Sequence, residues 1–318
     1  MYEHYCYADL SPIQKLQLAI RNILSTEISI RPLNANHKPG GLLEFPEDDE
    51  REVIIVGDLH ANKHNLKAIL MDCQNLYKLK ENKAIMLFLG DAPHDERTGH
   101  RKEMATSIEI MDIIIHLLND YPDNVFYILG NHDTFSPRLG KSGIQQGLLY
   151  HNECLKKYGK EYVNLMQIFF NVLPVFVIHK YFLAVHAGPA RGGITRDQII
   201  NIRSSVSEDL LKQLTWNRLN ETRSSPSQKE YSPDDLNKQR EVLNYPPEFP
   251  IIVGHNPMWR LGTDDSIWVD ILGSKSHTIL CSNMANKCTY ISFTNSTKYK
   301  IKHADLRIPK SKYTLDNY

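Results

Sequence analysis

The 318-residue sequence has no long hydrophobic run, no Cys-x-x-Cys pair and no excess of charge of either sign. No apolar stretch reaches about 18 residues, so a membrane span is not expected. The N-terminal stretch MYEHYCYADL lacks the basic and apolar regions of a cleaved signal. Because the net charge is zero and the basic clusters are short, a general nucleic-acid-binding protein is not expected either.

The cysteines are few and scattered, and their number is odd. They are Cys6, Cys73, Cys154, Cys281 and Cys288. This usage fits a reducing compartment better than a disulfide scaffold. We therefore expect a cytoplasmic location, with secretion into a host cytosol without a cleaved signal as the open alternative.

Helical and strand patterns alternate through the first half of the chain. Residues 11–27 are predicted to form a helix, since Ser11 can cap it and Pro12 suits its first position. Apolar runs such as VIIVGD and AIMLFLGD then alternate with helical patterns. This order predicts an α/β fold whose strands are buried on both faces. The polar residues 220–249, rich in Ser and Pro, are predicted to form a loop or insertion.

Five apolar runs end in side chains that can bind a metal ion. In an open α/β sheet, ligands bind beyond the carboxyl ends of the strands, so these ends can meet at one edge. A lone Gly-Asp after a strand is usually only a turn, but five such signals in order are hard to obtain by chance. The candidate ligands are Asp58, His60, Asp91, Asn131, His186 and His255.

The donor atoms of this set are carboxylate and amide oxygens and imidazole nitrogens, which suit Mn²⁺, Fe or Zn²⁺. Six ligands are too many for one catalytic ion with an open position, but they suit two neighbouring ions. Such a pair needs a bridging carboxylate, for which Asp91 is the natural candidate. Two metals stabilise both oxygens of an in-line displacement and lower the pKa of a bound water. The residues therefore predict hydrolysis of a phosphoester.

The same motifs resemble those of the calcineurin-like metallophosphoesterases, most closely the phosphoprotein phosphatase (PPP) branch. GDLHAN (57–62) resembles the family's GDxHG, GNHD (130–133) its GNHE, and LTWNR (214–218) its LLWSD. The resemblance covers about residues 52–295 and implies a central β-sandwich of mixed sheets flanked by helices. It implies a metallophosphatase catalytic domain over 51–300, an N-terminal helical and loop extension over 1–50, and a C-terminal tail over 301–318.

The resemblance also implies roles for single residues. Asp58, His60 and Asp91 would hold the first metal, and Asp91, Asn131, His186 and His255 the second. His132 stands at the position of the general acid that protonates the leaving oxygen, and a hydroxide bridging the metals would attack phosphorus. Mn²⁺ is our first expectation for both divalent ions, with Fe, Zn²⁺ and Mg²⁺ as alternatives.

The sequence departs from the family at the second motif, GDxVDRG, which here reads GDAPHDERTGHRKEM (90–104). His94 stands where the family has the Asp that orients the acid, so Asp95 is our candidate partner of His132. The phosphate-binding Arg of this motif is missing as well. The candidate phosphate-binding residues are Arg218, Arg97, Arg101 and Arg191, although Arg97 and Arg101 are equally well explained as solvated loop residues.

These departures favour a divergent, bacterial-type phosphatase, a candidate effector, that acts on phosphorylated proteins or peptides. Phosphotyrosine is favoured over phosphoserine and phosphothreonine. A hydrolase of dinucleoside polyphosphates is one alternative, although the region after His186 resembles the protein phosphatases in length. A non-enzymatic scaffold with the same fold is another, although all the ligands and His132 are retained.

Overall fold

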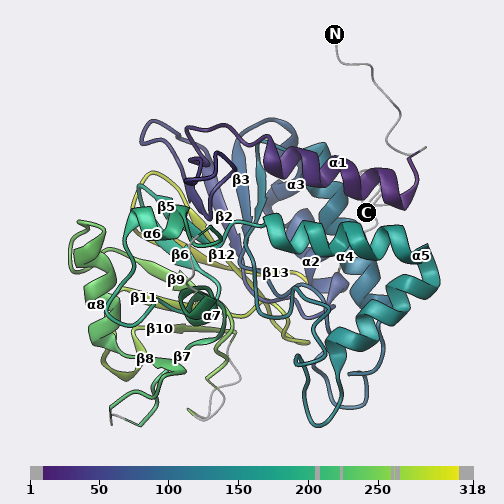
Figure 1. Cartoon of the computed structure of the whole chain (residues 1–318). Coiled ribbons are helices and arrows are strands. Elements are labelled where there is room, and N and C mark those ends of the chain that lie inside the picture. Colours follow the sequence, from purple (N-terminus) through teal and green to yellow (C-terminus); the bar gives the residue numbers. More distant parts are fainter. Residues whose placement is uncertain (1–9, 205–207, 223–224, 259–260, 262–265, 308–318) are drawn as a thin grey trace.

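The computed structural model describes residues 10–204, 208–222, 225–258, 261 and 266–307. Two β-sheets lie face to face, and helices cover the outer face of each (Figure 1). The apolar layer between the sheets contains residues of both, among them Ile55, Leu87 and Ile252. The expected α/β fold, a β-sandwich of mixed sheets flanked by helices, is confirmed.

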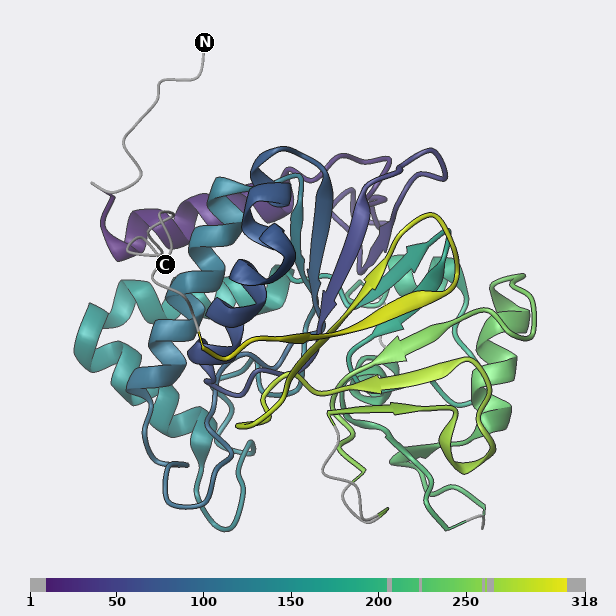
Figure 2. The same cartoon turned by 180° about the vertical axis from the view of Figure 1, so that it is seen from behind.

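The first sheet has five strands and contains the alternating pattern seen in the sequence. Its order is β13 (Tyr299–Ala304), β12 (Cys288–Phe293), β2 (Glu52–Val56), β3 (Ala84–Phe88) and β4 (Val125–Tyr127). β2, β3 and β4 are parallel, and the β12–β13 hairpin extends the sheet beside β2 (Figure 2). Its outer face is covered by α1 (Pro12–Leu24), α2 (Lys63–Met71), α3 (Asn75–Lys80), α4 (Ala105–Asp120) and α5 (Gln146–Val172).

The second sheet has six strands. Its order is β1 (Leu42–Glu44), β5 (Phe176–His179), β6 (Phe182–Val185), β9 (Ile251–Val253), β11 (His277–Leu280) and β10 (Ile267–Val269). β6 and β9 are parallel, so their carboxyl ends point the same way. The outer face packs against α6 (Arg196–Ile200), α7 (Glu208–Trp216), α8 (Pro233–Val242) and the two-stranded sheet of β7 (Arg218–Leu219) and β8 (Glu230–Tyr231).

The segment 220–249, expected to be a loop or insertion, contains β8 and α8, so this prediction was wrong in part. Ser232 caps α8 and Pro233 occupies its first turn. The helix is held by polar contacts as well as by Leu236, because the buried Arg240 guanidinium donates to the carbonyl oxygens of Phe249 and Lys275. A helix anchored in this way has too weak an apolar period to be seen in the sequence.

Segments near both ends of the described chain belong to the packed fold, either against a sheet or as one of its strands. α1 begins where the sequence predicts it, after the capping Ser11, and packs in the core of the first sheet's outer face. β1 pairs with β5, and β13 pairs with β12 as far as Ala304. The domain limits at residues 51 and 300 stay predictions. Within the described residues, no helix combines the length and hydropathy needed to cross a bilayer.

Candidate metal centre

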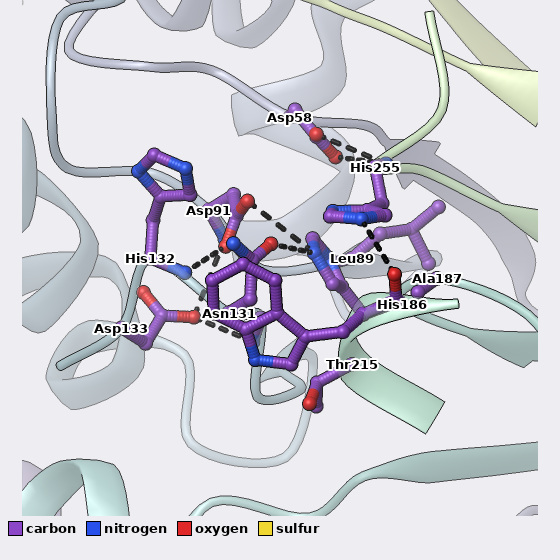
Figure 3. Close-up of polar contacts among 12 residues, drawn as sticks. Asp58, Leu89, Asp91, Asn131, His132, Asp133, His186, Ala187, Thr215 and His255 are labelled. Carbon is purple, nitrogen blue, oxygen red and sulfur yellow. Dashed lines mark hydrogen bonds and ion pairs between the residues drawn. The ribbon is translucent and has the colours of Figure 1, made fainter. Parts of the chain in front are cut away.

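The candidate ligands converge at the carboxyl ends of five strands, as expected from the sequence. Asp58 and His60 follow β2, Asp91 follows β3 and Asn131 follows β4 in the first sheet. His186 and His255 follow β6 and β9 in the second. Figure 3 shows the side chains of Asp58, Asp91, Asn131, His186 and His255 gathered in one place between the two sheets.

The backbone at this edge is strained where it delivers the ligands. His60, Asp91 and His255 have φ angles of 42°, 53° and 59°. This left-handed region costs a non-glycine residue about 1–3 kcal/mol and persists only where the surrounding structure enforces it. Gly130 and Gly254 allow two carboxylates to approach the backbone closely. A Cβ at these positions would lie only 2.1 Å from the carboxylate of Asp91 and 2.2 Å from that of Asp58.

Two clusters of ligand atoms form the centre, and both contain Asp91. The first is Asp58, His60 and Asp91, and the second is Asp91, His186 and His255; within each, the ligand atoms lie within 4.8 Å of one another. All of these side chains are buried. The oxygen Oδ1 of Asn131 lies 3.0 Å from Nε2 of His186 and so belongs beside the second cluster.

Backbone carbonyls fix the tautomers of two histidines. Nδ1 of His186 donates to the carbonyl of Leu89 over 2.7 Å, and Nε2 of His255 donates to that of Trp216 over 3.2 Å. In the neutral form of each residue, the other ring nitrogen has a lone pair that a metal ion can accept. Hydrogen bonds of this kind commonly orient metal-binding histidines.

The electrostatics of the centre fit cations. Oδ1 of Asp91 accepts the backbone N–H of His132 over 2.6 Å, and the buried Oδ2 lies 3.3 Å from Nε2 of His186. Burial alone would lower the pKa of His60, but Glu96, Asp58 and Asp91 outweigh it and raise the pKa to about 10. At His186, burial is likewise outweighed, chiefly by Asp91, and the pKa rises to about 9. A bound cation can take the place of these protons, so the residues fit a two-metal site.

His132 lies at the edge of the centre without joining either of these clusters. Its ring centroid is 4.9 Å from that of His60 and 5.4 Å from that of His94. Burial, together with His60 and His94, holds the pKa of His132 well below its usual value. Its Nδ1 is buried and meets no hydrogen-bonding group in the described parts of the chain.

Asp95, the predicted partner of His132, is turned away and pairs with Arg97. Its carboxylate accepts from the backbone N–H of Arg97 over 2.9 Å and from the guanidinium over 2.5 Å. His94 takes the place beside His132 instead, because its φ of 71° reverses the chain at this residue. The His94 ring is fully buried, and burial followed by the charge of His60 lowers its pKa to about 3, so it is neutral.

The four candidate arginines differ in their relation to the centre. Arg97 is tied to Asp95, Arg101 to the carbonyl of Glu96 and to Ser142, and Arg191 to the carbonyl of Ser227. Arg218 is exposed, yet its charge lowers the pKa of both Glu96 and His255. Arg218 is therefore the candidate whose charge acts on the centre.

Glu96 belongs to the site, although it was not among the predicted site residues. Its Oε2 lies 3.8 Å from Nε2 of His60, its Oε1 lies 3.8 Å from Nε2 of His132, and Lys141 contacts Oε1 at 2.8 Å. Burial alone would raise its pKa, but His60, Lys141 and Arg218 outweigh burial and hold the pKa below its usual value. No motif indicated which charged residue of the loop over 92–104 points inward.

Asp133, the last residue of GNHD, was also missed as part of the site. Its carboxylate accepts from the Tyr127 hydroxyl over 2.6 Å and from the Gly130 N–H over 2.7 Å. Burial and the neighbouring charge of Asp91 raise its pKa to about 7. The sequence did contain a signal for Asp133, because it occupies the position of the Glu in the family's GNHE motif.

The geometry agrees with what comparison with known proteins finds. A model of the calcineurin-like phosphoesterase family matches residues 52–278. The chain belongs to this family. It is 27% identical to serine/threonine-protein phosphatase T of Schizosaccharomyces pombe over 191 residues, which are 56% of this chain and 35% of that protein. It is 26% identical to a putative serine/threonine-protein phosphatase of Caenorhabditis elegans over 171 residues, 52% of this chain and 42% of that one.

Solved structures of two phosphatases share the fold. A Saccharomyces cerevisiae serine/threonine phosphatase with similarity to human PP5 superposes with a TM-score of 0.65 at 17% identity, over 92% of this chain and 88% of that one. A cold-active protein-tyrosine phosphatase of a Shewanella species gives a TM-score of 0.51 at 14% identity, over 83% and 82%. The alignments with the curated relatives span only about a third to two-fifths of those proteins.

Proposed function

We propose that this calcineurin-like phosphoesterase is a two-metal phosphatase that removes phosphate from proteins or peptides. The observation that carries the proposal is the pair of ligand clusters joined at the buried Asp91. The serine/threonine phosphatases among its relatives support the substrate class. The four described cysteines are free thiols, which supports a reducing compartment.

Each ligand has a proposed place. Asp58, His60 and Asp91 hold the first ion, and Asp91, Asn131, His186 and His255 hold the second, with Mn²⁺ the first choice and Fe, Zn²⁺ or Mg²⁺ as alternatives. Two such ions supply the Lewis acidity that activates water and stabilises charge on the phosphoryl oxygens. Arg218 adds a positive charge that draws the phosphate towards the centre.

His132 is the proposed general acid. Its backbone N–H is bonded to Asp91, so its ring is held at a fixed distance from both clusters. His94 replaces Asp95 as the residue that positions this ring. A neutral imidazole stabilises a protonated His132 less than a carboxylate would, so the site is best suited to leaving groups that need little protonation.

This reasoning favours phosphotyrosine over phosphoserine and phosphothreonine. A tyrosine leaves as a phenoxide of pKa about 10, whereas an alkoxide needs a proton. The Shewanella protein with the same fold is named a protein-tyrosine phosphatase, which agrees with this choice.

The test combines metal analysis with a substrate panel. We expect two Mn²⁺ per chain after loading, and hydrolysis of phosphotyrosine peptides that exceeds hydrolysis of matched phosphoserine and phosphothreonine peptides. Diadenosine tetraphosphate serves as the control for a nucleotide hydrolase. Turnover of the dinucleotide alone would contradict the proposal, and a phosphoserine preference would contradict its finer part.

A further inference from the structure

The carboxylate of Glu96 lies where groups from several segments converge. Nε2 of His60, Nε2 of His132 and Nζ of Lys141 surround it at 3.8, 3.8 and 2.8 Å. Burial alone would raise the pKa of Glu96, but His60, Lys141 and the exposed Arg218, on β7, outweigh it and hold the pKa below its usual value. Imidazoles, an ammonium and a guanidinium together form a site for an anion, and in this structure the anion is part of the chain itself.

Glu96 does not lie with the main ligand clusters. It forms a group with His60 and His132, whereas Asp58 and Asp91 form a separate group with His60. Its side chain is 24% exposed, while that of Asp58 is 2% exposed. Glu96 therefore approaches His60 from the solvent side, the side from which a substrate must enter.

The partner of Glu96 comes from a second loop that is joined to the first. Lys141 lies in the turn over residues 140–144, in which its backbone pairs with Ile144. The two loops are connected by Arg101, which donates to Ser142, and by Gln146, which donates to the carbonyl of Asp95. The Lys141 ammonium is thereby held 2.8 Å from the carboxylate of Glu96, in whose loop the arginine of the family's second motif is missing.

We propose that Glu96 occupies the phosphate position of the free protein and that Lys141 is the cation that passes from Glu96 to the substrate phosphate. This inference rests on the proposed phosphatase function. An incoming phosphate repels the Glu96 carboxylate, which moves towards solvent, and the ammonium exchanges one anion for the other. Small anions must compete with Glu96, whereas a phosphopeptide has further contacts with which to displace it.

The test is the binding of inorganic phosphate to the Mn²⁺-loaded protein, measured by isothermal titration calorimetry. Glu96→Gln should tighten phosphate binding by roughly tenfold, because it removes a competing charge. Lys141→Met should weaken binding by roughly tenfold, and should do so in the Glu96→Gln background as well. Glu103→Gln and Lys102→Met, both exposed in the same loop, are the matched controls and should change nothing.

Each result decides a part of the proposal. Unchanged or weaker phosphate binding by Glu96→Gln would overturn the anion role, and loss of manganese from that variant would make Glu96 a metal ligand instead. If Lys141→Met has no effect once Glu96 is neutral, Lys141 only restrains Glu96 and the transfer is wrong. Failure of the phosphatase function is seen separately, as two bound Mn²⁺ and the expected changes in phosphate binding without turnover of any phosphopeptide.

Discussion

The five strand ends and the loop over residues 92–104 contribute to the same site but hold their side chains in different ways. The strand ends present buried ligands on a backbone fixed by two sheets. The loop presents charged residues that pair within the loop, as Asp95 does with Arg97, or with a neighbouring turn, as Glu96 does with Lys141. In our proposals, the first region holds the metal ions and the second determines which anions approach them.

The largest expected effect comes from removing the shared carboxylate. Asp91→Asn should disturb both metal sites, because Asp91 belongs to both clusters. Elemental analysis after Mn²⁺ loading should find fewer than two ions per chain. Asp95→Asn, in the loop, is the matched control and should keep both. Two ions in an active Asp91→Asn would contradict the shared role.

His132→Ala should have the second largest effect, a loss of turnover. Loss of a general acid lowers turnover by about 10²–10⁴, and both metals should remain because His132 is not a proposed ligand. The loss should be smaller for p-nitrophenyl phosphate, whose leaving group needs little protonation. Equal losses on aryl and alkyl phosphates would remove the acid role.

Arg218→Ala should have an intermediate effect. A charge-assisted hydrogen bond to the phosphate is worth about 1.5–3 kcal/mol, so kcat/KM should fall by roughly one to two decades. Arg191→Ala is the control, since that side chain contacts Ser227 away from the centre. Equal kcat/KM for wild type and Arg218→Ala would assign phosphate binding to other cations.

The smallest expected effect separates His94 from Asp95. His94→Phe keeps a buried ring but removes the nitrogens beside His132, so kcat on alkyl phosphates should fall by roughly tenfold, within the range of acid-base catalysis. Asp95→Asn should leave kcat nearly unchanged, because its carboxylate faces Arg97. The pH profile of kcat should shift in His94→Phe alone. The opposite ranking of the two variants would restore Asp95 as the positioning residue.

The sequence predicted the strand ends and left the loop unresolved for physical reasons. The residue that follows a buried parallel strand lies at the carboxyl edge of the sheet. Asp91 and His186 could therefore be placed at that edge from the apolar runs that precede them. In the loop, His94 lies in the left-handed region, and Asp95 pairs with Arg97 while His94 lies beside His132. The pairing of Glu96 with Lys141 joins residues far apart in the chain, and no local pattern encodes it.

The hydrogen bond from the His132 backbone to Asp91 Oδ1 has a consequence for how this site tolerates change. One carboxylate sets the spacing between the proton donor and both ion positions, so a displacement of the end of β3 carries all three along together. Catalysis is sensitive to shifts of about 1 Å in the reacting groups. Because His132 and both ligand clusters contact the same carboxylate, a shift of Asp91 changes the distances between them little. We therefore expect that the part of the neighbouring loop after Glu96 can be lengthened or recharged in engineered variants while the reacting groups keep their relative positions, provided that His94 stays beside His132.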